Sequence, residues 1–383
     1  QKRSQKQPNR NSIGCLSKEE LIMARLGISL YPEHSTLEKD KAYVTLAAKY
    51  GFKRIFTCLL SVEKQREEIL SEFRELIDHA HSYGMEVILD VAPFVFEKLQ
   101  VSYDDLSFFA EMHADGIRLD EGFDSLKESL MTYNPQNLKI EINASLGTKY
   151  LDNIMSHYPK LDNIITCHNF YPQRYSGISY AHFEKCSQDI KNLNMKVAAF
   201  VSSQEEGTYG PWPVNEGLCT LEIHRDLPID VQARHLFATR LVDDVIIANA
   251  YASEEELSTL SKIDPGKLTF KIDFEAELHP TEEKIIYEHP HFVRGDMSEY
   301  MARSTMPRVT YAKESVPPKN TRDLKRGDVV IVNDEYSRYK GELHIVLKDM
   351  PNDGRKNVIG HIPENETMLL DYIKPWKSFG FMR

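Results

Sequence analysis

The feature that most constrains the fold is a regular alternation of short apolar runs and amphipathic helical segments from residue 26 onward. The apolar runs predict eight strands, at 26–33, 52–61, 85–93, 116–120, 138–145, 163–171, 196–203 and 244–252. Helical segments follow, and those at 36–51 and 62–84 end on glycines suited to helix C-caps. Eight strand-helix units in roughly 240 residues predict a (β/α)8 TIM-type barrel of the α/β class.

A doubly wound open sheet is the competing α/β architecture. It rarely needs eight equal units, and no G-x-G-x-x-G motif follows any predicted strand. We therefore favour the barrel, which we place at residues 26–265 after an N-terminal arm at 1–25.

The chain changes character after the linker-like segment 263–267. Residues 266–383 carry short β-type runs separated by turn signals, which predict a small, mostly β domain. Within it we expect strands at 284–288 and 308–312 and a helical turn at 297–304. The domain has no nucleophile motif or metal-ligand cluster, so we expect it to support the barrel, cover its mouth or form an oligomer contact.

The net charge and the cysteines limit the classes of function. Lys and Arg total 47 and Asp and Glu total 58, which gives −11 at pH 7 and argues against binding to nucleic acid. No apolar run approaches the roughly 20 residues that cross a bilayer, and the opening segment lacks a signal-peptide core. The five cysteines form no C-x-x-C pair. We expect a reduced, cytoplasmic protein with no membrane segment, metal or other cofactor.

Polar residues interrupt the predicted strands on the face that points into the barrel. Side chains alternate along a strand, and the apolar set must cover the helices. With Ile140 and Ile142 outward, Glu141 and Asn143 point inward. The same alternation places residues of three other strands inside the barrel or at its rim: Ser29, Tyr31, Glu33, Asp90, Arg118 and Asp120. Barrel enzymes react at the carboxyl ends of their strands, so we expect the active site there.

Four of these residues, Glu33, Asp90, Asp120 and Glu141, bring carboxylates to one end of the barrel. Crowded carboxylates raise one another's pKa values, which is one way in which catalytic acids arise. The alternative is a set of structural ion pairs, in which Arg118 neutralises Asp120 or Glu141. One arginine among several acids leaves an excess of negative charge, and this charge suits an oxocarbenium-like transition state.

The rim segments carry residue types that bind sugars. The sixth strand ends in CHNFYP (167–172), whose histidine, amide and aromatic rings suit hydroxyl groups and a ring face. The long segment 202–226 brings more such side chains to the rim: Tyr209, Trp212, Glu216, Glu222, His224 and Arg225. His224 and Arg225 precede a helix that starts near Pro228, a place that favours phosphate. The alternative is a surface excursion without function.

Four motifs in this order resemble the 6-phospho-N-acetylmuramidase family: LGISLYPE (26–33), ADGIRLDEGF (114–123), ITCHNFYPQ (165–173) and EGLCTLEIHRD (216–226). The resemblance covers essentially the whole chain. It implies a (β/α)8 barrel with a C-terminal cyclophilin-like domain and a cytoplasmic role in peptidoglycan recycling. The implied reaction cleaves the β-1,4 bond of N-acetylmuramic acid 6-phosphate–N-acetylglucosamine and releases the phosphorylated muramic acid and N-acetylglucosamine.

The choice of catalytic residues is chemical, because the resemblance does not assign them. We expect Asp120 and Glu141, on adjacent strands, to be the central carboxylates, with Glu33 and Asp90 as substitutes or helpers. The other candidates for binding the substrate are Arg118, Asn143, His168, Asn169, Tyr171, Tyr209, Glu222, His224, Arg225, Asn249 and Arg303. Of these, His224, Arg225 or Arg303 would bind the phosphate.

The stereochemical route and two rival functions stay open. Retaining, inverting and substrate-assisted hydrolysis all fit; DGIRLDEG resembles a chitinase motif, but Gly122 stands in its glutamate slot. A non-catalytic carbohydrate-binding protein would bind the sugar without releasing product. A phosphodiesterase or aldolase-type barrel needs metal ligands or a Schiff-base lysine, and Lys139 lies too early in its strand. A homo-oligomer, in which the small domain of one copy closes the site of another, is also open.

Overall fold

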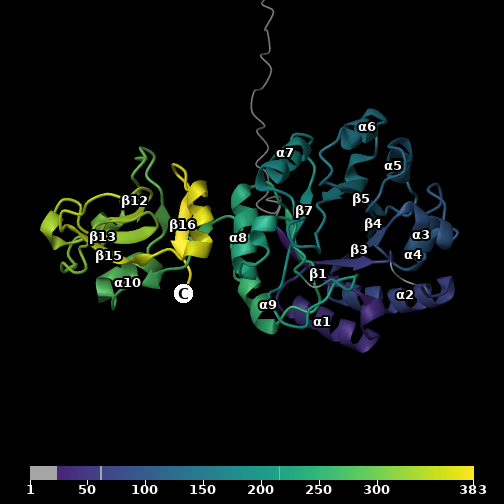
Figure 1. Ribbon diagram of the computed structural model, residues 1–383, viewed down its shortest axis with the longest axis horizontal. Helices are drawn as coiled ribbons and strands as arrows, with labels where there is room; N and C mark the ends of the chain where they lie inside the picture. The colour runs from purple at the N-terminus through teal and green to yellow at the C-terminus, as the bar shows by residue number, and fades with distance from the viewer. Residues whose placement is uncertain (1–23, 61–62, 215) are drawn as a thin grey trace, which may run out of the picture.

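The fold is taken from a computed structural model, which describes residues 24–60, 63–214 and 216–383 (Figure 1). Eight parallel strands close into a barrel in sequence order: β1 (Arg25–Leu30), β2 (Arg54–Cys58), β3 (Glu86–Val91), β4 (Gly116–Leu119), β5 (Lys139–Asn143), β6 (Ile164–Cys167), β7 (Val197–Val201) and β8 (Asp244–Ile247). The predicted barrel is confirmed. The expected N-terminal arm falls mainly on 1–23, outside the described residues, and Arg25 already begins β1.

Helices cover the outside of the barrel: α1 (Leu37–Lys49), α2 (Arg66–Ser82), α3 (Pro93–Lys98), α4 (Ser107–Glu111), α5 (Leu126–Met131), α6 (Tyr150–Ser156), α7 (Tyr180–Lys191), α8 (Ile229–Thr239) and α9 (Glu254–Ser261). The 3-10 helices η1 (Pro32–His34), η2 (Leu161–Asn163) and η3 (Glu222–His224) lie in the connections. Gly51 and Gly84, the predicted helix-ending glycines, follow α1 and α2 with φ of +80° and +67°. None of the helices in the described residues is long and apolar enough to span a membrane.

Side-chain alternation along the strands produces two apolar regions. The predicted outward residues, such as Ile117 and Ile140, pack in the cluster between the strands and the helices. Phe56, Phe200 and Ile246 belong to a separate cluster that fills the barrel interior. Polar side chains that point inward therefore lie above or below an apolar plug, at one end of the barrel or the other.

The C-terminal domain begins after α9 and contains two small sheets. Its elements are β9 (Leu268–Phe270), β10 (Asp273–Phe274), α10 (Pro280–Tyr287), β11 (His291–Phe292), β12 (Met301–Ser304), α11 (Pro307–Thr310), β13 (Asp328–Val332), η4 (Asp334–Tyr336), β14 (Leu343–Val346), β15 (Lys356–His361), η5 (Glu364–Tyr372) and β16 (Ser378–Phe381). The strand orders are β10-β15-β13-β14-β12 and β11-β16-β9. The expected small domain of mostly antiparallel strands is present.

Three local expectations for this domain are wrong. The run 284–288 lies largely in α10, which begins with a capping box in which the Glu282 side chain accepts a hydrogen bond from the His279 amide at 2.9 Å. The run 308–312 lies largely in α11, which Pro307 begins. The segment 297–304 contains β12 in place of a helical turn, because its residues pair with β14. In α10 and α11, the signals for the start of a helix outweighed the β propensity of the residues. In β12, pairing with β14 outweighed the local helical pattern.

Helix α8 joins the two domains. All its residues from 229 to 238 are buried, and Figure 1 shows the helix between the barrel strands and the C-terminal domain. Arg234 on α8 donates through Nη1 to Glu366 Oε2 at 2.8 Å and to the backbone oxygen of Thr269 at 2.9 Å. A helix that is buried on both sides explains why the sequence of α8 shows no solvent-facing polar stripe.

Candidate active site at the carboxyl end of the barrel

An arginine on β4 organises the polar residues at the carboxyl ends of the strands. The Arg118 guanidinium donates through Nη1 to Asp90 Oδ1 at 2.5 Å and to Asp120 Oδ1 at 3.1 Å, and through Nη2 to Asn169 Oδ1. Asp90 is the register partner of Arg118 on β3, Asp120 directly follows β4, and Asn169 follows β6. One buried cation therefore ties together residues from three strands.

The two carboxylates that share Arg118 differ in their surroundings. The Asp90 side chain is 4% exposed, whereas that of Asp120 is 34% exposed. Burial raises the pKa of Asp90 to about 7, Arg118 opposes this shift, and the Asp120 charge adds to it. Asp90 therefore exchanges its proton near neutral pH, and Asp120 is the member that a substrate can touch.

Glu33 lies in η1 and faces the same end of the barrel. Burial is the main cause that raises the pKa of the Cys58 thiol, and the charges of Asp90 and Glu33 raise it further. Both carboxylates therefore lie near the end of β2. Glu33, Asp90 and Asp120 form a group that we call the mouth carboxylates, and Arg118 is its buried cation.

An aromatic series runs from the barrel interior to its mouth. Ring centroids are 5.2 Å apart for Phe56 and Phe200, 5.1 Å for Phe200 and Phe170, and 6.1 Å for Phe170 and Trp212. Trp212 is 40% exposed, and an exposed ring backed by other rings is a surface on which a sugar ring packs. Sequence reasoning places Trp212 at the rim and includes Phe170 among the aromatic rings of CHNFYP, but it does not predict that these two rings are neighbours.

Three of the predicted binding residues, Asn143, Asn169 and Tyr171, are half-buried near the mouth carboxylates. Asn143 Nδ2 donates to the backbone oxygen of Asp120 at 3.4 Å. Asn169 Oδ1 accepts from Arg118, while its Nδ2 has no hydrogen bond to any described residue. Asn169 therefore offers a free donor next to the arginine that holds Asp120.

Tyr209 and Asn249 belong to the connections after β7 and β8. The Tyr209 amide donates to the backbone oxygen of Ala250 at 2.7 Å, and its ring lies 6.2 Å from that of His34 at the rim. Asn249 is buried; its Oδ1 accepts from the Ser203 amide at 2.7 Å and its Nδ2 donates to the Ser203 oxygen at 3.0 Å and to Thr208 Oγ1 at 2.8 Å. Asn249 therefore holds the backbone and has no donor left for a substrate.

Glu141 belongs to a different ion-pair network. Its side chain is fully buried and accepts from Arg54 Nη2, while Arg54 Nη1 donates to Asp244 Oδ2 at 2.8 Å. Arg54 and Asp244 are the first residues of β2 and β8, so this network occupies the amino end of the barrel. The structure does not bring Glu141 and Asp120 together as a pair. The alternation of side chains along β5 predicts that Glu141 points into the barrel. It does not predict that the Arg54 side chain, from the amino end of β2, reaches Glu141.

His168 is fully buried, and both of its ring nitrogens have partners. Nδ1 lies 3.1 Å from Ser145 Oγ and Nε2 lies 2.8 Å from Ser187 Oγ. Burial lowers the pKa of His168 to about 3, so the ring is neutral. Ser145 Oγ in turn accepts from the backbone amide of Asn169 at 2.9 Å, so His168 supports the position of Asn169 through Ser145.

Arg225, the first candidate for binding phosphate, uses all three of its side-chain nitrogens within the protein. Nε and Nη2 donate to the two Glu222 oxygens at 2.7 and 2.6 Å, and Nη1 donates to the backbone oxygens of Tyr171, Glu216 and Gly217 at 3.0, 3.0 and 3.1 Å. The hydrogen bonds from Arg225 lower the pKa of Glu222 to about 2. This pair joins the connections after β6 and β7 and has a structural role.

His224 and Arg303 also lie away from the mouth. His224 is fully buried with its Nε2 at 2.7 Å from His235 Nδ1 on α8, and burial holds its pKa well below the usual range. Arg303 lies on β12, in the C-terminal domain, which α8 separates from the barrel strands (Figure 1). None of the three expected phosphate ligands therefore faces the mouth of its own barrel.

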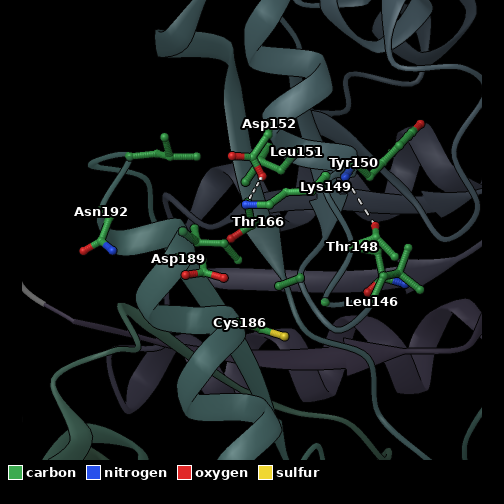
Figure 2. A pocket seen from close by; sticks show the side chains of 15 residues that line it. Leu146, Thr148, Lys149, Tyr150, Leu151, Asp152, Thr166, Cys186, Asp189 and Asn192 are labelled. Carbon is green, nitrogen blue, oxygen red and sulfur yellow. Dashed lines mark hydrogen bonds and ion pairs between the residues drawn. The ribbon is translucent and has the colours of Figure 1, made fainter.

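A pocket of about 220 Å³ lies outside the barrel, between α6 and α7 (Figure 2). Leu146 and Lys149 line it from the connection after β5, and Cys186 and Asp189 line it from α7. None of the mouth carboxylates lines this pocket. Among residues 24–60, 63–214 and 216–383, no group of three or more His, Cys, Asp or Glu side chains is arranged to hold a metal ion.

Comparison with known proteins gives the family. Family models described as 6-phospho-N-acetylmuramidase, N-terminal, and 6-phospho-N-acetylmuramidase, C-terminal, match residues 26–262 and 268–382. The crystal structure of an uncharacterized B. cereus protein is 51% identical and has a TM-score of 0.87; the match covers 94% of this chain and 100% of that chain. A conserved protein of unknown function from Enterococcus faecalis, 24% identical with a TM-score of 0.71, shares the fold over 94% of this chain and 96% of that chain. No curated protein matches. The chain belongs to the 6-phospho-N-acetylmuramidase family, which is named for a glycosidase.

Proposed function

We propose that this protein hydrolyses the β-1,4 bond of N-acetylmuramic acid 6-phosphate–N-acetylglucosamine, in the cytoplasm and as a step of peptidoglycan recycling. The family name supports the substrate class. The observation that carries the site is the Arg118 cluster, in which two carboxylates share one guanidinium and only Asp120 opens to the mouth. Paired carboxylates in unlike surroundings are the usual basis of acid and base roles in glycosidases.

Asp120 is the residue that we assign to the reacting bond. Its ion pair with Arg118 fixes the carboxylate at the end of β4, and its exposed oxygen can approach an anomeric carbon from the barrel axis. A negative oxygen at that position stabilises the positive charge that develops on the sugar ring.

Asp90 replaces Glu141 in the proposed pair. Its pKa of about 7 leaves a large fraction protonated at neutral pH, so Asp90 can hold a proton next to Asp120, the carboxylate that a substrate can touch. Glu141 lacks access to the mouth because its side chain is fully buried and paired with Arg54. Glu33 lies at the same rim and is the helper carboxylate of the proposal.

The sugar is proposed to pack on Trp212, with hydroxyl and acetamido groups bonded by Asn169 and Tyr171. The free Nδ2 of Asn169 donates, and the Tyr171 hydroxyl accepts or donates. These residues flank Asp120 on the β6 side of the mouth, where a ring and its polar substituents are recognised together.

The test is sugar release from N-acetylmuramic acid 6-phosphate–N-acetylglucosamine beside the same disaccharide without phosphate, each with and without EDTA. We expect cleavage of the phosphorylated compound alone, undiminished by EDTA. Asp120→Asn should lower turnover by about 100-fold or more, whereas Glu121→Gln, which changes the exposed neighbouring carboxylate, should leave it unchanged. Binding of the disaccharide without any product would contradict the proposal and favour a carbohydrate-binding protein.

A further inference from the structure

Three elements of the C-terminal domain bring two arginines onto one buried carboxylate. Glu342, which directly precedes β14, accepts from Arg303 Nη2 at 2.8 Å and from Arg308 Nη1 at 2.7 Å. Arg303 comes from β12 and Arg308 from α11. The Glu342 side chain is fully buried, whereas the two arginine side chains are 26% and 31% exposed. The carboxylate therefore lies beneath the guanidinium groups and fixes their directions.

One carboxylate does not satisfy two guanidinium groups. Arg303 Nη1 and Arg308 Nε and Nη2 have no hydrogen bond to any described residue. Both guanidinium carbons lie 5.7 Å from the centre of the Tyr339 ring, which holds them on the same side of the domain. Two guanidinium groups beside one carboxylate leave a local net charge of +1, on a chain whose net charge is −11.

The third polar neighbour of the carboxylate adds no positive charge. His344 Nε2 lies 3.0 Å from Glu342 Oε2, but burial lowers the pKa of His344 and Glu342 only partly opposes this. Arg294 is the next cation; its amide donates to the Arg303 backbone oxygen at 2.9 Å, and its side chain is paired with Asp296. The unfilled donors of the cluster thus belong to Arg303 and Arg308.

We propose that Arg303 and Arg308 form a binding site for a small oxyanion, a phosphate group or a carboxylate, on the C-terminal domain. Guanidinium groups that are already oriented and partly desolvated bind such oxygens with charge-assisted hydrogen bonds. The site lies beyond α8 from the barrel strands (Figure 1), so it is separate from the mouth carboxylates and does not rest on the proposed hydrolase activity.

Titration calorimetry of the full chain with inorganic phosphate and, separately, with sodium acetate tests the proposal. We expect saturable binding of at least one anion, weakened tenfold or more in the double variant R303A/R308A. Arg326→Ala is the matched control, because Arg326 is also an ion-paired arginine of this domain, bonded to Asp371 at 2.9 Å. Binding of phosphate alone would identify a phosphate site, and binding of acetate alone a carboxylate site.

Two outcomes would overturn the proposal. One is the absence of saturable binding of either anion to the unaltered chain. The other is equal affinity in the unaltered chain and in R303A/R308A, which would place the bound anion elsewhere, for example in the barrel. If the double variant does not fold, as judged by circular dichroism, Arg308→Gln keeps the Arg303–Glu342 pair and must still weaken binding.

Discussion

Arg54 lies toward the amino end of the barrel interior and Arg118 toward its carboxyl end, and each buried guanidinium holds two carboxylates. Arg54 pairs with Glu141 and Asp244, and these side chains are at most 4% exposed. Arg118 pairs with Asp90 and Asp120, and Asp120 is 34% exposed. Both arginines hold two carboxylates, and the two clusters differ in the access that solvent and substrate have to them.

A buried ion-pair cluster inside a barrel is therefore a candidate for catalysis only where one of its carboxylates stays accessible. A closed ion pair has a structural role, and removing one partner leaves an uncompensated buried charge. An open pair can change partners when a substrate enters.

The largest expected effect is that of Asp120→Asn. Losing the negative oxygen at the mouth should lower kcat by about 100- to 10,000-fold, the range of a positioned acid-base or charged group. Stability should change little, because the side chain is partly exposed and asparagine keeps its shape. Steady-state kinetics and a urea unfolding curve measure both quantities; unchanged turnover would remove Asp120 from the site.

Glu141→Gln should lower the stability of the protein and have little effect on kcat, the reverse of what we expect for Asp120→Asn. Leaving Arg54 with one carboxylate in a fully buried place should lower the free energy of unfolding by about 3 kcal/mol. Among molecules that remain folded, kcat should fall by less than about tenfold, below the range of an acid-base group. Glu86→Gln is the matched control, since Glu86 pairs with Arg25 near the surface and should contribute less than about 1 kcal/mol. A collapse of kcat without loss of stability would restore Glu141 to the catalytic pair.

Asp90→Asn should change how stability depends on pH. The native pKa of about 7 lies above the ordinary value of 3.8, so between these values the native state binds more protons than the unfolded state. The stability contributed by this group is therefore present at low pH and is lost as pH rises to about 7. Asparagine cannot ionise, so the stability of the variant relative to wild type should rise by about 3 kcal/mol from pH 5 to pH 8. Parallel urea curves at the two pH values measure this; a constant difference would show that Asp90 is already ionised at pH 5.

The smallest effect is expected for Arg225→Lys. Lysine cannot supply both the paired hydrogen bonds to Glu222 and those to three backbone oxygens. The connections after β6 and β7 should therefore be held less firmly, and the free energy of unfolding should fall by about 1–2 kcal/mol. Because these connections carry Tyr171 and Trp212, KM should rise more than kcat falls. Arg174→Lys, at an exposed pair with Asp226, is the control and should leave KM unchanged. Loss of selectivity for the phosphorylated substrate would instead return Arg225 to the phosphate site.

Much of the fold follows from local sequence pattern. Each barrel strand is a short apolar run whose side chains alternate, and several helices carry their own caps, as Thr36 and Gly51 do for α1. In the C-terminal domain the pattern was less reliable, because β12 depends on pairing with β14 and the Ile285–Ile286 pair sits in a capped helix.

The candidate site is only partly predictable for a related reason. Alternation correctly predicts that Asp90, Arg118 and Asp120 share the barrel interior, and the motif after β6 correctly places Asn169 near them. It cannot reveal that Arg225 and His224 turn away from the mouth, since their partners come from other connections and from α8.

The barrel and the inward face of each strand follow from the sequence alone, because strand periodicity and helix caps are local properties. Only the tertiary structure decided which carboxylate opens to the mouth. That choice depends on how far the Arg54 and Arg118 side chains reach across neighbouring strands, and on the closing of the rim by Arg225. These are contacts between residues far apart in the chain, and no local pattern encodes them.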